Sequence, residues 1–295
     1  MSKKIPKKSF LRDFFITAAL VCVPFLPAFA GSSGLTLHFI DVGEGDAVLA
    51  VTPSSRTVLV DAGNLISGFR TAEYLKSLGI DRLDAVIFSH AHPDHAGGAF
   101  FILQEFGADR VFDNGQSLKE LAATQDFYRW YGLLARGHKN YKAINAGYAF
   151  EIDGVIFRVL WPPASPAGGP ALSADLNAGS LVVMVEYGDF RCLLSGDSTR
   201  EAQSRLALGA DLSAKVLKLG HHADCDSNPE GFLKAVSPRV AVASIDRDDA
   251  RNRPCPETLK YLDRAGARLY RTDQDNDIII TADKNGDYAA IVKPR

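Results

Sequence analysis

The sequence predicts a domain of the α/β class, in which strands and helices pack in layers. Two observations support this prediction. Extended apolar runs alternate with helical patterns in both halves of the chain, an order typical of layered α/β domains. In addition, histidines and aspartates gather directly after several of the predicted strands, where α/β proteins place their functional groups.

The first half of the chain opens with runs rich in β-branched and apolar residues, which predict strands. Helical patterns follow, and the first of them ends at a glycine, as many helices do. The elements predicted are, in order, strands at 35–42, 46–53 and 56–63, a helix at 67–79, a strand at 84–90, and helices at 97–107 and 117–137.

The second half repeats the alternation after three consecutive apolar runs. These runs predict neighbouring strands, and the later pattern returns to single strands separated by helices. The elements predicted are strands at 157–163, 180–188 and 190–196, a helix at 199–209, a strand at 214–222, a helix at 229–236, a strand at 239–244, a helix at 256–266, and strands at 268–272 and 277–282.

The first thirty residues differ from the rest of the chain. Five basic residues precede an apolar run that ends in Ala-Phe-Ala, a small-x-small cleavage site. This order is typical of a secretory signal peptide. We therefore expect a signal peptide at 1–30 and a single domain at 31–295, exported to the periplasm or secreted. An uncleaved membrane anchor at 10–30 is the alternative, although the apolar run is short for a bilayer span.

The composition is that of a soluble globular domain, with 46% apolar and 23% charged residues. The net charge of the chain is −2; without the first thirty residues, 28 basic and 34 acidic residues remain, a net charge of −6. An acidic domain lacks the broad basic surface of a high-affinity nucleic-acid binder. Single-stranded nucleic acid stays open as a partner, but the charge does not support it.

The cysteines predict one disulfide. Cys22 belongs to the predicted signal peptide, and Cys192 lies in an apolar strand-like run, where we expect a buried thiol. Cys225 and Cys255 lie in polar, loop-like stretches, and an exported protein can form disulfides. We therefore expect these two to pair. None of the cysteines has the spacing of a structural zinc site.

Residues 89–98 read SHAHPDHAGG, which places three of the seven histidines after a predicted strand in the pattern H-x-H-x-D-H. In a tight turn, histidines two apart converge on one ion, and the adjacent aspartate and histidine reach a second. Imidazole and carboxylate suit Zn²⁺, Mn²⁺ or Fe²⁺. We expect Gly97 and Gly98 to give the backbone freedom to turn beneath the ions.

Other ligand types also follow predicted strands. Asp197 comes after the strand at 190–196, and the pair His221 and His222 ends the strand run at 214–222. Asp46 and Asp61 have a similar placement. A lone aspartate after a strand is often a helix cap, and this alternative stays open for Asp197. Its coincidence with the histidine motifs favours metal binding.

The order of the motifs DVGEGDA, VDAGN, SHAHPDHAGG, LLSGD and LKLGHH resembles the metallo-β-lactamase superfamily. More narrowly, it resembles the hydrolase domain of the ComEC/Rec2 competence proteins, over nearly all of residues 35–283. The resemblance implies a four-layer αβ/βα sandwich with two divalent ions, Zn²⁺ or Mn²⁺, at one edge. We expect a free-standing, exported relative without the polytopic membrane part of a ComEC transporter.

The resemblance also implies roles for individual residues. His221 would face the substrate as a hydrogen-bonding group or an acid, although which of His221 and His222 is the ligand stays open. Asp61 and Asp46 would lie behind the ligands and orient them. Asp61 could also orient the hydroxide that bridges the two ions. Six metal ligands are implied: His90 and His92 on the first ion, Asp94, His95 and His222 on the second, and Asp197 bridging the two.

The sequence departs from the family pattern in three places. Where many members supply one more histidine to the first ion, Asn177 or Ser180 stands, so we expect that ion to bind weakly or only with substrate. His138 is a spare candidate for the missing ligand, and Asn177 is a candidate for substrate binding. The family's HHGS reads HHAD, with Asp224 in its last position. A later GHP reads RP, and Arg253 would put a cation near the site, which suits an anionic substrate. A surface position is the alternative for Arg253.

The resemblance implies a metal-dependent hydrolase that uses a metal-bridged hydroxide. We expect a phosphodiesterase that acts on nucleic acid, on a phosphate-bearing small molecule or on an envelope component. Two alternatives stay open. One is an amide or ester hydrolase of the β-lactamase or lactonase type, and the other is a metal-binding protein without catalytic activity. We predict a phosphate-ester or other small-molecule substrate and no stable membrane partner.

Overall fold

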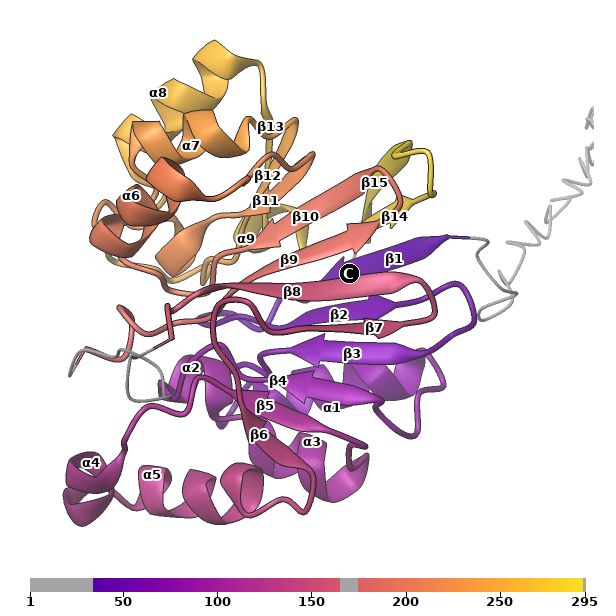
Figure 1. The fold of residues 1–295 in the computed structure, drawn as a ribbon, viewed down its shortest axis with the longest axis vertical. Coiled ribbons are helices and arrows are strands. Elements are labelled where there is room, and N and C mark those ends of the chain that lie inside the picture. The colour runs from indigo at the N-terminus through magenta and orange to yellow at the C-terminus, as the bar shows by residue number, and fades with distance from the viewer. Residues whose placement is uncertain (1–33, 165–174, 294–295) are drawn as a thin grey trace, which may run out of the picture.

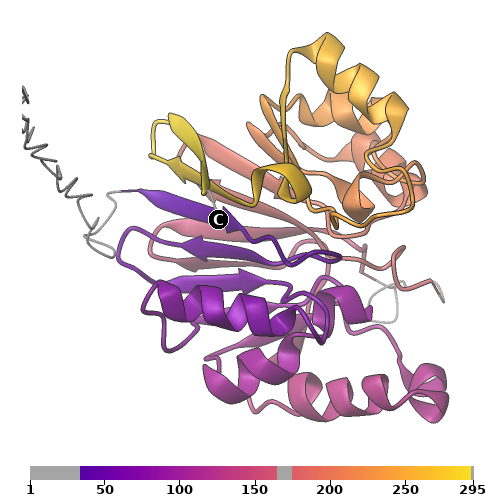
Figure 2. The same cartoon turned by 180° about the vertical axis from the view of Figure 1, so that it is seen from behind.

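Two mixed β-sheets lie face to face, and helices cover their outer faces (Figure 1). The computed structural model describes residues 34–164 and 175–293. The view from behind shows the same four layers, with one set of helices on each side of the paired sheets (Figure 2). The α/β class predicted from the sequence and the four-layer αβ/βα sandwich implied by the resemblance are therefore confirmed. The predicted signal peptide at 1–30 lies outside the described residues.

The first sheet has eight strands, and its parallel part, from β3 to β6, lies at one end. The other neighbours in this sheet run antiparallel. In spatial order the strands are β15 (Tyr288–Lys293), β14 (Asp277–Ala282), β1 (Leu35–Phe39), β2 (Val48–Val51), β3 (Thr57–Val60), β4 (Ala85–Ile87), β5 (Val111–Asp113) and β6 (Tyr141–Ala143).

The second sheet has seven strands, with parallel pairing from β10 to β13 and antiparallel pairing from β7 to β10. In spatial order the strands are β13 (Arg268–Arg271), β12 (Val240–Ala243), β11 (Val216–Lys218), β10 (Phe190–Leu194), β9 (Val182–Tyr187), β8 (Val155–Trp161) and β7 (Ala149–Ile152).

The helices of the N-terminal half lie on the side of the first sheet, and α6, α7 and α8 lie on the side of the second (Figure 1). The helices are α1 (Gly68–Ser77), α2 (Pro93–Ala96), α3 (Ala99–Glu105), α4 (Lys119–Thr124), α5 (Asp126–Tyr131), the π-helix η1 (Gly132–Arg136), α6 (Arg200–Gly209), the 3₁₀ helix η2 (Gly220–Ala223), α7 (Glu230–Val236), α8 (Pro256–Ala265) and α9 (Thr272–Asp275).

Three apolar clusters hold the layers together, one between the sheets and one under each set of helices. In β3, Val58 and Val60 belong to the cluster between the sheets, whereas Leu59 belongs to the cluster under the helices. Because such strands are buried on both faces, they read as continuous apolar runs rather than as alternating ones. Phe150 and Phe157 stack between the sheets, with ring centroids 5.0 Å apart.

Most of the predicted helices and strands are present, with two kinds of difference. The helix predicted at 117–137 is divided into α4, α5 and η1, because Gln125 between the first two has the extended backbone angles φ −129° and ψ 119°. Four strands were missed: β5, β6, β7 and β15. The first two have only three residues each, and residues of β6, β7 and β15 are largely exposed, so their sequences carry little apolar signal.

Cys225 and Cys255 form a disulfide, and Cys192 is a buried free thiol, as predicted. Within the described ranges, no helix has the length and apolar character that a bilayer crossing requires.

Candidate metal centre

Four strand ends bring the predicted site residues to one edge of the two sheets. Asp61 directly follows β3, and His90 follows β4 in the same sheet. Asp197 follows β10, and the pair His221 and His222 follows β11 in the other sheet. Because each of these strand pairs is parallel, their carboxyl ends lie at a common edge, where functional groups of α/β folds collect.

The motif at 89–98 forms a loop and a single helical turn. Pro93 begins this turn, α2, as a residue with a pre-set φ suited to a first helical position. Gly97 and Gly98 have ordinary helical φ angles of −64° and −68°, so the expectation that they supply conformational freedom was wrong. A side chain on Gly98 would instead collide with the backbone oxygen of Ala62. These glycines let two backbone segments approach closely.

Asp94, His95, Asp197 and His222 form a compact cluster, here called the second metal group, whose ligand atoms all lie within 4.8 Å of one another. Nε2 of His95 lies 3.2 Å from Oδ1 of Asp197. Nε2 of His222 lies 3.5 Å from Oδ2 of Asp197 and 3.3 Å from Oδ2 of Asp94. Two imidazoles and two carboxylates at such separations can coordinate one divalent ion.

His90, His92 and Asp197 form another compact cluster, here called the first metal group. Nε2 of His90 lies 3.9 Å from Oδ2 of Asp197 and 3.0 Å from Nδ1 of His92. Asp197 is therefore common to both metal groups, which is the arrangement expected of a bridging carboxylate.

The buried atoms of these clusters fit a cation. Among the described residues, Nε2 of His95, Nε2 of His222 and Oδ1 of Asp197 are buried and have no hydrogen-bond partner. Buried polar atoms are seldom left without a partner, and an ion between them would satisfy all three. Neutral imidazole and carboxylate are also the donors that zinc and manganese accept. The residues present therefore fit the divalent ions that the sequence predicts.

Asp61 orients His95 from behind. Its carboxylate accepts hydrogen bonds of 2.7 Å from the backbone N–H and from the hydroxyl of Ser89. The same carboxylate lies 2.8 Å from Nδ1 of His95. A histidine that donates its Nδ1 proton to a carboxylate presents Nε2 to a metal. This geometry agrees with the expected orienting role of Asp61, and its part in catalysis stays a prediction.

Asp197 is held in place by Ser180, and it is not the cap of the helix that follows. The backbone N–H of Asp197 donates to Oγ of Ser180 at 2.9 Å. Gly196, directly before it, has φ +49° and packs so closely on Ser180 that a side chain would collide with that hydroxyl. The cap of α6 is Thr199, whose side chain accepts from the backbone N–H of Ala202. The capping alternative for Asp197 was therefore wrong.

The cluster carries a high density of negative charge. Burial by itself lowers the pKa of His222, but Asp197 and Asp94 raise that pKa to about 9. Burial lowers the pKa of His90 well below its ordinary value, with a further contribution from His95. Burial raises the pKa of Asp61, although His95 opposes that shift. Carboxylates packed this closely around buried imidazoles favour a bound cation.

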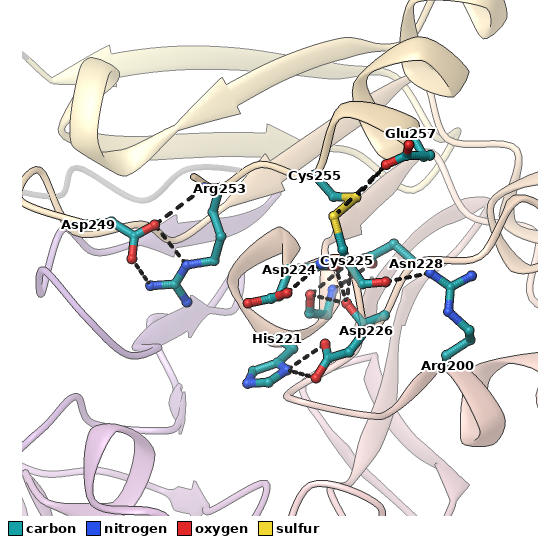
Figure 3. Close-up of a disulfide and its surroundings, with 12 residues drawn as sticks. Arg200, His221, Asp224, Cys225, Asp226, Asn228, Asp249, Arg253, Cys255 and Glu257 are labelled. Atoms are coloured by element: carbon teal, nitrogen blue, oxygen red, sulfur yellow. Dashed lines mark hydrogen bonds and ion pairs between the residues drawn. A yellow bond between two sulfur atoms is a disulfide. The ribbon is translucent and has the colours of Figure 1, made fainter. Parts of the chain in front are cut away.

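The predicted substrate-facing residues have different surroundings. Nε2 of His221 lies 3.8 Å from Oδ2 of Asp197, and the amide nitrogen of Asn177 lies 3.4 Å from the same Nε2. Arg253 is buried, so the alternative of a surface position was wrong. Its guanidinium donates to Asp249 at 2.6 and 3.0 Å (Figure 3). Its charge is therefore balanced, and its contact with a substrate stays a prediction. His138 follows η1 and belongs to neither metal group.

Lys218 was missed by the sequence analysis. Its ammonium group donates to Oδ2 of Asp46 at 2.7 Å and to the backbone oxygen of Leu219 at 2.9 Å. The other carboxylate oxygen of Asp46 lies 3.6 Å from Nδ1 of His222, so Asp46 has the expected place behind a ligand. The available signal was a lysine inside the apolar run VLKLG, where a charge needs a buried partner.

Comparison with known families agrees with this geometry. The family profile described as "Metallo-beta-lactamase superfamily" matches residues 40–245, which include both metal groups. The chain belongs to the metallo-β-lactamase superfamily. This membership indicates the general function of a metal-dependent hydrolase. In this superfamily member, each of the two sheets contributes residues to the candidate metal centre.

The curated relatives of this superfamily member include three proteins, two of which have names that refer to competence or recombination. ComE operon protein 3 of Bacillus subtilis is 28% identical over 93% of this chain and 37% of its own length. Competence protein ComA of Neisseria gonorrhoeae is 28% identical over 91% of this chain and 35% of its own. Recombination protein 2 of Haemophilus influenzae is 31% identical over 79% of this chain and 27% of its own length. The chain thus spans about a third of the length of these relatives.

Solved structures show the same metallo-β-lactamase fold at low sequence identity. YhfI from Bacillus subtilis, a metallo-β-lactamase fold protein, matches 84% of this chain and all of its own, with a TM-score of 0.54 at 11% identity. Zn²⁺-bound PqqB from Methylobacterium extorquens matches 79% of this chain and 97% of its own, with a TM-score of 0.52 at 12% identity. These similarities support the fold alone.

Proposed function

We propose that this chain is an exported, divalent-metal-dependent phosphodiesterase. The observation that carries the proposal is the pair of metal groups that share Asp197 and contain buried ligand atoms without hydrogen-bond partners among the described residues. Centres with two ions a few ångströms apart suit displacement at phosphorus, because both the attacking and the leaving oxygen can be stabilised.

The proposed chemistry divides between the ions and the protein. Bound divalent ions supply Lewis acidity and lower the pKa of a water molecule to near neutrality. The residues of this chain hold the geometry: Asp61 fixes the ring of His95, and Ser180 fixes the backbone of Asp197. His221 and Asn177 stand beside the shared carboxylate, where they can contact a substrate oxygen. Asp197 itself is proposed as the bridging ligand, with the remaining five ligands divided as the resemblance implies.

A phosphodiester is favoured as substrate over an amide or ester. Two ions close together stabilise the negative charge that accumulates on the phosphoryl oxygens. The names of two matched relatives refer to competence and to recombination, which favours a nucleic-acid phosphodiester. The net charge of −2 argues against tight binding of long nucleic acid. We therefore propose short or single-stranded nucleic acid, or a smaller phosphate ester, as the substrate class.

Export is proposed from the sequence pattern at 1–30 and from the disulfide between Cys225 and Cys255. Disulfides persist in the periplasm and outside the cell, and they are rare in the cytosol. A culture fractionated into cytoplasm, periplasm and medium tests this part of the proposal. Recovery of the full-length chain from the cytoplasm alone, with both cysteines reduced, would overturn it.

Hydrolysis assays test the substrate class. Purified protein loaded with Mn²⁺ or Zn²⁺ should hydrolyse bis-p-nitrophenyl phosphate and degrade single-stranded DNA, and EDTA should stop both reactions. Nitrocefin should remain intact. Hydrolysis of nitrocefin or a lactone without phosphodiester cleavage would favour the amide or ester alternative. Metal binding without any hydrolysis would favour the binding protein.

A further inference from the structure

His221 has the hydrogen-bond arrangement of a metal-binding histidine, although it belongs to neither metal group. Its Nδ1 lies 2.7 and 2.9 Å from the two carboxylate oxygens of Asp226 (Figure 3). His95 has the same arrangement with Asp61, at 2.8 Å. Metal-binding histidines almost always donate one ring N–H to a carboxylate, carbonyl or water, which leaves the other ring nitrogen as the ligand. Asp226 therefore presents Nε2 of His221 as a ligand atom.

That nitrogen faces the shared carboxylate. Nε2 of His221 lies 3.8 Å from Oδ2 of Asp197, and Nε2 of His90 lies 3.9 Å from the same oxygen. Ligand atoms that are each about 2.1 Å from one ion lie at most about 4.2 Å apart. His221 thus stands about as far from the shared oxygen as His90 does, and this distance allows one ion to bind both His221 and Asp197. Because His221 lies outside the 4.8 Å grouping of His90, His92 and Asp197, its ring must move towards these two histidines for one ion to bind all four residues.

The first metal group is also the poorer of the two in ligands. It has two histidines and the shared aspartate, whereas the second metal group has Asp94 in addition to its two histidines. Asn177 stands where the resemblance leads us to expect a histidine, and its amide nitrogen lies 3.4 Å from Nε2 of His221. An imidazole is a better ligand for zinc than an amide. His221 is therefore the stronger donor at this position.

The backbone at 221–223 has an unusual conformation, and neighbouring contacts hold it in place. His221, His222 and Ala223 have φ angles of 47°, 52° and 63°, in the left-handed region that costs free energy for residues other than glycine. This conformation lets both consecutive imidazoles face Asp197. The backbone N–H of Cys255 donates to the oxygen of Ala223 at 2.8 Å, and the disulfide from Cys255 ties down the same loop (Figure 3).

We propose that His221 is a ligand of the first metal group through Nε2, and that Asp226 is the positioning residue that holds its ring. The inference rests on the proposed two-ion centre and deepens it, because it gives the first ion a third imidazole from the opposite sheet. The two adjacent histidines then serve different ions, His221 the first and His222 the second. The site would accept Zn²⁺ and its spectroscopic substitute Co²⁺.

Calorimetric titration of the EDTA-stripped protein with Zn²⁺ tests this assignment without substrate. The wild type should bind two ions. His221→Ala should weaken one of them by at least about tenfold and leave the other unchanged, and Asp226→Asn should weaken the same ion by about 10–100-fold. His138→Ala, a histidine outside both metal groups, should bind both ions as the wild type does. The visible spectrum of the Co²⁺ form should change only in the first two variants.

A compensating variant sharpens the test. Asn177→His in the His221→Ala background should restore much of the lost affinity, because it supplies an imidazole to the same ion. If His221→Ala fails to fold, as judged by circular dichroism, Asp226→Asn carries the test by itself, since it keeps the imidazole. Wild-type affinities for both ions in His221→Ala and Asp226→Asn would overturn the assignment. Two bound ions without any phosphodiester hydrolysis would overturn the proposed function instead.

Discussion

Asp46 and Lys218 form an ion pair of 2.7 Å beneath the candidate metal centre, although 172 positions separate them in the sequence. Both side chains are almost wholly buried. The pair joins the loop after β1 to the end of β11, and so links the two sheets at the edge where the ligands gather. Asp46 also approaches Nδ1 of His222 at 3.6 Å. The pair therefore lies directly behind one of the candidate ligands, whose Nδ1 lies 3.2 Å from the backbone oxygen of Ser244.

Lys218→Met should destabilise the protein by about 3–5 kcal/mol, because it leaves the carboxylate of Asp46 buried without its partner. Urea unfolding followed by circular dichroism measures this loss. The double variant Lys218→Met with Asp46→Asn should recover most of it, since no unpaired charge remains. Lys234→Met, which breaks an exposed pair with Glu230, should cost less than about 1 kcal/mol. Equal unfolding midpoints for Lys218→Met and Lys234→Met would contradict the prediction.

Asp197→Asn should remove the shared ligand while keeping the size of the side chain and the backbone bond to Ser180. We expect weaker binding of both ions and a fall in turnover of more than about a hundredfold, or about 2.7 kcal/mol of transition-state stabilisation. Metal content and phosphodiester hydrolysis are the measurements. Asp211→Asn, at an exposed carboxylate paired with Arg191, is the control. Two tightly bound ions in Asp197→Asn would show that the carboxylate is not shared.

Gly98→Ala should destabilise the protein by about 1–3 kcal/mol, because its side chain would collide with the backbone of Ala62. Gly132→Ala is a matched substitution at a helical φ of −58° with open space around it. That variant should be stabilised by about 0.5–1 kcal/mol. Thermal unfolding of both variants measures the difference, and a wild-type midpoint for Gly98→Ala would refute the packing role.

Protonation of His38 should lower the free energy of unfolding in mild acid. Burial, with a smaller contribution from Lys293, lowers its pKa from 6.5 to about 4. The unfolded chain therefore binds the proton first, so stability is complete above pH 6.5 and is lost as the pH falls towards 4. The loss from this group is up to about 3 kcal/mol. Urea unfolding between pH 4 and 7, in EDTA, should show a shallower pH dependence for His38→Gln. Parallel profiles for the two proteins would exclude this contribution.

The strands and helices with strong apolar periodicity could be predicted from the sequence. Residues 57–60, within the strand predicted at 56–63, are buried on both faces, so their composition alone marks them as a strand. Strand β6 has three residues and an exposed or half-exposed surface, and its place in the sheet comes from pairing with β5. Local sequence does not encode such pairing. The break at Gln125 likewise interrupts a pattern that reads as one continuous helix.

The candidate site divides in the same way. The motif at 89–98 is local, so spacing by itself indicates ligands for two ions. The role of Asn177 and the surroundings of Arg253 could not be derived, because they depend on residues distant in the fold or on side-chain conformation. Arg253 was expected to put a cation near the site, and the sequence did not reveal that Asp249, four residues earlier, accepts its hydrogen bonds. The charge pattern of the sequence does not distinguish a paired guanidinium from an unpaired one.

The sequence by itself determined the α/β class, the set of metal-binding residue types and their positions after strands, because these properties follow from local periodicity and short spacings. Only the tertiary structure decided which residues meet. It placed Asp197 in both metal groups, set Asp61 behind His95 and paired Lys218 with Asp46. It also turned His221 and His222 towards the same carboxylate. Such contacts join segments far apart in the chain, and they arise only when the two sheets pack against each other and bury a common edge.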